Sequence, residues 1–270
     1  CGNTAVGMFS VATNTTGASN VGIGRNSLRA NTTAANNTAV GTNSLCANTT
    51  GVDGTAVGHS ALLGNTTGAN NVAVGHDALF TNTDCNNNTG LGTFALRLND
   101  AGDNTAVGFA SMCATTTGAS NTAVGTYSLD ANTTGTRNVA VGFCSLTANT
   151  SGADNTAVGN DSLRSNTTGA NNVAVGKNAL VANTEGDANT AVGCNTLGAN
   201  TTADNNTAIG AFALDTNTTG GDNTAVGKNA LTANTTGGAN AAVGMDTLKA
   251  NTTGTSNVAV GFKSLLTNTT

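Results

Sequence analysis

Apolar and polar residues recur along this chain with a period of seventeen. Each period opens on Asn-Thr-Ala-Val-Gly, with minor changes, and continues through Ser-Leu or Ala-Leu to Ala-Asn-Thr-Thr-Gly. Sixteen copies are present, and one interval, Gly92 to Gly108, is sixteen residues long. We number the repeat from its leading asparagine, so the glycine that ends the opening string is repeat position 5. A short fixed period predicts a unit that buries its apolar face by stacking on copies of itself.

The repeat favours strands and turns over helices. Two glycines and many asparagines and threonines in each unit disfavour a helix, and seventeen residues are too few for two packed helices. Positions 1–4 and 9–14 each suit a short strand, and each stretch ends at a glycine that allows a tight bend. The prediction is an all-β parallel β-solenoid, or β-roll, of about sixteen coils of seventeen residues, with two short strands in each coil.

The second predicted strand is expected to place positions 9 and 11 inside and positions 10, 12 and 14 outside. Position 10 accepts arginine, aspartate, lysine, phenylalanine and glycine, which indicates solvent, whereas position 9 is leucine in nearly every unit. Burying one leucine side chain is worth roughly 1.5–3 kcal/mol, so we expect one stacked inner file. The predicted file consists of Leu28, Leu45, Leu62, Leu79, Leu96, Leu129, Leu146, Leu163, Leu180, Leu197, Leu214, Leu231, Leu248 and Leu265.

The first predicted strand carries no charge at positions 2, 3 and 4 of any unit. Position 4 is always Val, Ile or Leu, and position 3 is Ala except for Gly22 and Gly90. A strand restricted on both faces is expected to be buried on both, yet one thin coil covers only one of them. The candidate cover is an identical chain in a closed symmetric assembly. The alternative is a wider solenoid in which corner residues shield the alanine.

Units of Asn-Thr-Ala-Val-Gly followed by Ser-Leu or Ala-Leu resemble the head repeats of trimeric autotransporter adhesins and the repetitive shafts of bacterial and phage tail-fibre proteins. The resemblance covers all sixteen units, although the adhesin head repeat is shorter. It implies a left-handed parallel β-roll, a homotrimer and surface attachment. The expected function is a non-catalytic structural fibre or shaft of a surface adhesin, a viral or phage fibre or an extracellular filament. Its expected location is extracellular, or on a cell or virion surface, with identical chains and cell-surface or matrix ligands as partners.

Asparagine recurs at positions 1 and 12. The leading row, Asn3, Asn20 and onward, is expected to form amide ladders at the strand edge, where backbone groups need partners. At position 12 an outward Asn-Thr-Thr or Asn-Thr-Ser is also an N-glycosylation acceptor, and the alternative is plain turn chemistry. The acceptor candidates are Asn14, Asn31, Asn48, Asn65, Asn132, Asn149, Asn166, Asn200, Asn217, Asn234, Asn251 and Asn268.

The same outward rows support a second functional hypothesis, an ice-binding or glycan-surface-binding solenoid. Asparagine at position 12 and threonine at position 14 are expected to form a grid with a spacing of about 4.8 Å between coils. Asp84 and Glu185 interrupt the threonine row, and the irregular stretch 83–103 breaks the grid. The structural fibre is therefore the first hypothesis and the ice or glycan binder the second.

Charge and hydropathy exclude some partners. The chain has 270 residues, with 9 Lys+Arg against 14 Asp+Glu and a net charge of −5, and no basic cluster, so nucleic acid is not expected. No apolar run approaches the roughly 20 residues that span a bilayer. Residues 1–270 are expected to form one repetitive segment of a longer chain, with irregular coils around 82–108.

Residues suited to chemistry are few. His59 and His76 share position 6 in adjacent units, with Asp77 beside them, so their imidazoles are expected about 5 Å apart. An isolated histidine pair lacks the closed ligand set that metal sites need. No metal, cofactor or catalytic residue is therefore predicted.

The six cysteines are predicted to be free thiols. Cys46 and Cys113 share position 10 but lie four units apart, which is roughly 19 Å at the spacing of stacked strands. A disulfide requires Cα atoms within about 7 Å. A bond between chains stays open, especially for Cys1.

Overall fold

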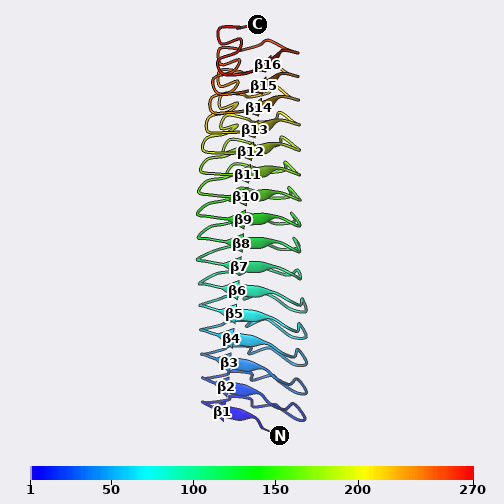
Figure 1. Ribbon diagram of the computed structural model, residues 1–270. Coiled ribbons are helices and arrows are strands. Elements are labelled where there is room, and N and C mark those ends of the chain that lie inside the picture. Colours follow the sequence, from blue (N-terminus) through cyan, green and yellow to red (C-terminus); the bar gives the residue numbers. More distant parts are fainter. Residues whose placement is uncertain (1) are drawn as a thin grey trace. The chain divides into compact units, whose positions relative to one another are not determined.

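The computed structural model describes residues 2–270, and Cys1 lies outside the described residues. The chain is all-β, with one strand of three residues in each repeat, drawn as arrows in Figure 1. Its contacts divide it into two compact units, Cys1–Thr136 and Arg137–Thr270. The first unit contains β1 (Thr4–Val6), β2 (Val21–Ile23), β3 (Thr38–Val40), β4 (Thr55–Val57), β5 (Val72–Val74), β6 (Thr89–Leu91), β7 (Thr105–Val107) and β8 (Thr122–Val124). The second contains β9 (Val139–Val141), β10 (Thr156–Val158), β11 (Val173–Val175), β12 (Thr190–Val192), β13 (Thr207–Ile209), β14 (Thr224–Val226), β15 (Ala241–Val243) and β16 (Val258–Val260).

Within each unit the strands form a parallel sheet in sequence order. In the second unit, Thr156 of β10 lies opposite Val173 of β11, and the same register runs from β9 to β16. The first unit repeats it from β1 to β8. Equivalent repeat positions therefore lie above one another, which confirms the predicted parallel β-solenoid. Residues 2–270 form no helix long and apolar enough to cross a membrane.

The segment at positions 9–14, predicted as a second strand, forms turns instead. Positions 7 and 9 have positive φ in every coil, for example Asn178 at 56° and Leu180 at 51°. The segment still bonds to the next coil, since the Leu180 N–H donates to the Thr196 carbonyl at 3.0 Å. The burial of these turns differs from the alternation of a strand, since positions 8, 9 and 12 are buried and positions 10 and 11 are mostly half-buried. The frequent asparagine and aspartate at positions 7 and 17, which tolerate positive φ, were the available signal.

Glycine at position 5 is required by the corner that follows each strand. Gly176 has a φ of 135°, which L side chains rarely adopt. A Cβ placed there would lie 2.5 Å from the carbonyl oxygen of Gly193 in the next coil. The close stacking of coils therefore depends on a residue without a side chain at this corner.

The leucines at position 9 form the core, as the pattern predicts. They are 0% exposed from Leu28 to Leu248, while Leu265 in the last coil is 48% exposed. From Ala39 to Ala259 the alanines at position 3 are buried, and a Cβ at Gly90 of β6 would meet the Leu79 side chain. Position 11, expected inside, is mostly half-buried instead.

The strands are not buried on both faces by their own chain. Alanine at position 3 faces inward, whereas positions 2 and 4 face outward and are half-buried or exposed. Val175 is 36% exposed and Ile209 is 42% exposed. One coil therefore covers only one face of its strand, as expected, and the cover of the outer face by an identical chain stays a prediction.

Candidate functional site

The asparagines at position 12 lie inside the coil, which overturns their predicted outward orientation. Asn183 is 0% exposed. Its Nδ2 donates to Oδ1 of Asn166 in the preceding coil at 2.9 Å and to the carbonyl of Gly186 in its own coil at 3.0 Å. Its Oδ1 accepts from Nδ2 of Asn200 in the next coil at 2.8 Å. Because stacking supplies these partners, hydrogen bonds offset the cost of removing this polar row from water.

The candidate glycosylation acceptors belong to this row. An N-linked sugar is joined to the side-chain amide nitrogen, which here is enclosed and already donates hydrogen bonds. Asn14 and Asn268, in the end coils, are half-buried. The other ten are 0–1% exposed, so the folded coil leaves no room for a sugar on them: Asn31, Asn48, Asn65, Asn132, Asn149, Asn166, Asn200, Asn217, Asn234 and Asn251.

The leading asparagines form a second row of hydrogen-bonded amides, as predicted. Most of them connect the start of their coil to the backbone near the end of the same coil. Oδ1 of Asn172 accepts the backbone N–H of Asn189 in the next coil at 2.9 Å, while its Nδ2 donates to the Gly186 carbonyl at 2.8 Å. That carbonyl also accepts from Asn183. Positions 1 and 12 are thus tied to one backbone oxygen at position 15, and this junction recurs through the coils.

The burial of position 12 removes the predicted Asn-Thr grid. Threonine at position 13 is also engaged, since Oγ1 of Thr184 donates to the carbonyl of Thr201 at 3.2 Å. Position 14 is outward and exposed, as at Thr168. The outward grid of asparagine and threonine proposed for ice binding therefore does not exist at these positions.

A more regular outward surface lies on the strands. We call it the strand face: repeat positions 2 and 4, from Thr4 and Val6 to Thr122 and Val124 in the first unit, and from Val139 and Val141 to Val258 and Val260 in the second. Position 2 is Thr or Val except for Ala241, and position 4 is Val, Ile or Leu. No charged residue interrupts either row. Each unit thus presents two adjacent uncharged rows to solvent.

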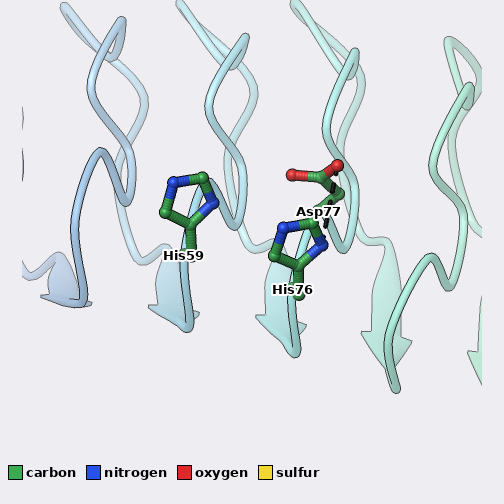
Figure 2. Close-up of side chains that lie close together, drawn as sticks. All are labelled: His59, His76 and Asp77. Atoms are coloured by element: carbon green, nitrogen blue, oxygen red, sulfur yellow. Dashed lines mark ion pairs between the residues drawn. The ribbon is translucent and has the colours of Figure 1, made fainter.

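His59 and His76 lie on adjacent coils directly after β4 and β5, with their rings side by side (Figure 2). The ring centroids are 5.1 Å apart and the planes differ by 10°, so the spacing predicted from the sequence is confirmed. The Asp77 carboxylate lies 3.6 Å from Nδ1 of His76 and 3.7 Å from Nε of Arg97. The Asp77 side chain is 13% exposed, while that of His76 is 49% exposed. We call His59, His76 and Asp77 the His–Asp cluster.

Aromatic rings continue from this cluster along the following coils of the first unit. His76 contacts Phe94 edge-on at 5.5 Å, and Phe94 contacts Phe109 at 5.9 Å. The Arg97 guanidinium lies 5.5 Å from the centre of the Phe94 ring. Sequence reasoning missed Arg97, because it stands at position 10 of the next unit, twenty residues beyond Asp77.

The irregularity expected around 82–108 is confined to one corner. The strands β6 and β7 keep the common register although sixteen residues separate them. The missing residue shortens the corner, where Nδ2 of Asn99 donates to the carbonyl of Ala101, two residues on instead of three. Thr66 and Thr67 both donate from their backbone to the Thr83 carbonyl. In the described part of the chain, the equivalent N–H groups one coil later form no such bonds.

Cys85 lies at this corner with two carboxylates. Its Sγ is 3.6 Å from Asp84 Oδ1 and 4.0 Å from Asp100 Oδ1. Burial, followed by the charges of Asp100 and Asp84, raises the pKa of the Cys85 thiol to about 11. Within residues 2–270 the cysteines are free, which agrees with the prediction: Cys46, Cys85, Cys113, Cys144 and Cys194.

Comparison with family models and with curated proteins finds no match for the chain.

Proposed function

We propose that the chain is a non-catalytic structural segment of an extracellular fibre, filament or adhesin shaft, and that its coils pack against copies of the same chain through the strand face. The observation that carries the proposal is the outward position of two rows without charge along every strand. Apolar surface of this kind is favourably removed from water, and burying it requires no desolvation of charge.

The size and regularity of the strand face suit self-association. Three strand residues of about 3.3 Å each and coils about 4.8 Å apart give roughly 400 Å² of flat surface over the eight coils of one unit. This matches the largest apolar patch of a typical monomer, and such patches commonly mark interaction sites. Copies of one chain share the same spacing between rows, so identical faces fit each other row by row. A closed symmetric assembly follows, and the adhesin and tail-fibre resemblance favours three chains.

The interior suits a mechanical role. Backbone hydrogen bonds connect every coil to the next within each unit, the two amide rows add side-chain hydrogen bonds, and the leucines add apolar contacts. The stability of such an array is close to a sum of coil and neighbour terms. A segment of this kind holds other parts of a molecule at a distance without any catalytic residue.

The test is the mass of the chain in solution, by sedimentation or light scattering, for the wild type and two variants in one coil. Val175→Lys places a charge on the strand face, and we expect it to convert the assembly into single chains. Val181→Lys is the matched control, since position 10 natively carries Lys249 and Arg29. A wild type that stays a single chain at micromolar concentration contradicts the proposal, and so does equal behaviour of the two variants.

The strand face also favours the second candidate, a binder of ice or of a regular glycan surface. Threonine and valine recur there with a spacing of about 4.8 Å, so the regular array lies on the strands and not at the Asn-Thr-Thr turns. Thermal hysteresis of the purified chain tests this candidate. If Val175→Lys abolishes thermal hysteresis without changing the mass in solution, the ice-binding hypothesis replaces the self-association hypothesis.

A further inference from the structure

We propose that the His–Asp cluster is a binding site for one divalent transition-metal ion of the kind that imidazole favours, such as Ni²⁺, Cu²⁺ or Zn²⁺. The two imidazoles and the carboxylate each offer one ligand atom, and these atoms lie within 4.8 Å of one another. Two imidazoles and one carboxylate are a common protein ligand set for these ions, with water in the remaining positions.

The stacking of the coils supplies the pairing of the two histidines. His59 and His76 follow strands that are paired in register, so their backbones are fixed one strand spacing apart. Bonds of about 2.0–2.1 Å to a tetrahedral ion place ligand atoms roughly 3.3 Å apart. Both rings are exposed, so a short swing of each toward the other closes the gap while the backbone stays in place.

Asp77 is a carboxylate without the hydrogen-bond partner that an asparagine at its repeat position can find. Asparagines at position 7 donate to their copy in the next coil, as Asn229 does to Asp246 at 2.9 Å. The neighbouring copies of Asp77 are Ser60 and Phe94. In the described residues its carboxylate has only the two contacts of 3.6 and 3.7 Å, both longer than a hydrogen bond.

Arg97 is the one cation of the chain in contact with Asp77 among the described residues. Its Nε is buried without a hydrogen-bond partner, and its guanidinium is packed against the Phe80 and Phe94 rings. A fixed positive charge beside the carboxylate opposes a bound cation. The Arg97 charge therefore lowers the affinity of the His–Asp cluster for a metal ion, although Arg97 forms no hydrogen bond with the carboxylate. Removing this charge is expected to tighten metal binding.

The experiment is calorimetric titration of the full chain with NiCl2. We expect one ion per chain, and affinity reduced at least about tenfold in His59→Asn, His76→Asn and Asp77→Asn. Asparagine occurs natively at position 6 in Asn160 and is frequent at position 7, so these variants keep the coil. Arg97→Gln is expected to bind several-fold more tightly.

Two controls separate this site from other ligands. Lys177→Asn makes the same kind of change at position 6 of a coil without histidine, and Cys85→Ser disables the thiol of the Asp84–Cys85–Asp100 corner. Both are expected to leave the affinity unchanged. The Cu²⁺ form is expected to show electron paramagnetic couplings to two imidazole nitrogens, reduced to one in each histidine variant. Full binding by His59→Asn, or loss of binding in Cys85→Ser, overturns the proposal, and so does the absence of binding by the wild type.

Discussion

Two files of side chains run through the coils at the same depth, the leucines at position 9 and the asparagines at position 12. Leu180 and Asn183 are both 0% exposed. Leucine stabilises the coil by removing apolar surface from water, which needs no particular partner. Asparagine is buried only because its copies above and below satisfy its amide. Burial in a stacked repeat is therefore decided by the recurrence of a residue as well as by its polarity.

The largest expected effect comes from interrupting the amide row. Asn183→Leu leaves Oδ1 of Asn166 buried without its donor and removes the bonds to Gly186 and Asn200. Since an orphaned buried group costs about 1–3 kcal/mol and each lost bond about 1, we expect a loss of about 4 kcal/mol in the free energy of unfolding. Denaturant titration measures it.

The control for this variant is Asn160→Leu, at an outer corner where the side chain makes only a 3.4 Å contact with Phe143. It is expected to change stability by less than about 0.5 kcal/mol. If Asn183→Leu behaves in the same way, the amide row is not a stabilising element and the comparison with leucine fails.

The leucine file is expected to give the next effect. Leu180→Ala leaves a cavity in the core and is expected to cost about 3 kcal/mol by the same titration. Val181→Ala, one residue on and half-exposed, is the matched control and is expected to be close to neutral. A cost equal to that of the control places Leu180 outside a packed core.

A smaller effect of opposite sign is expected where the amide row is naturally interrupted. Thr115 replaces asparagine at position 12, and its buried Oγ1 has no hydrogen-bond partner. Thr115→Asn restores the donor and acceptor of the row, so we expect a gain of about 1 kcal/mol. Thr115→Val removes the hydroxyl without restoring the row and should gain less. A destabilised Thr115→Asn contradicts the account of the row.

The smallest expected effect concerns the reactivity of the Cys85 thiol at the irregular corner. Because burial and two carboxylates raise the pKa of Cys85 to about 11, the thiol stays protonated near neutral pH. Its alkylation rate is expected to rise about tenfold per pH unit from pH 8 to 10. Asp100→Asn removes one of the charges and should accelerate alkylation at pH 8. Alkylation of the wild-type thiol that is already independent of pH above 8 refutes this assignment.

The sequence predicted the features that follow from exact recurrence. The parallel stacking, the inner leucines and the spacing of His59 and His76 all depend on residues seventeen apart lying above one another. The second strand was wrong because the spacing of leucine and variable residues was taken for strand alternation, whereas positive φ at positions 7 and 9 bends the backbone into turns. Position 12 was misplaced because asparagine was read by its polarity, although its near invariance, unlike the variety at position 10, indicated burial. The contact of Arg97 with Asp77 depends on the shape of one corner, which no repeat pattern encodes.

The central claim is that successive repeats stack in register and bury rows of hydrogen-bonded asparagine amides. The most direct measurement is hydrogen exchange of side-chain amides by NMR, with Asn183 and the more exposed Asn160 assigned by substitution. The account predicts that the Asn183 Nδ2 protons exchange many-fold more slowly than those of Asn160. Equally rapid exchange at both residues would contradict it.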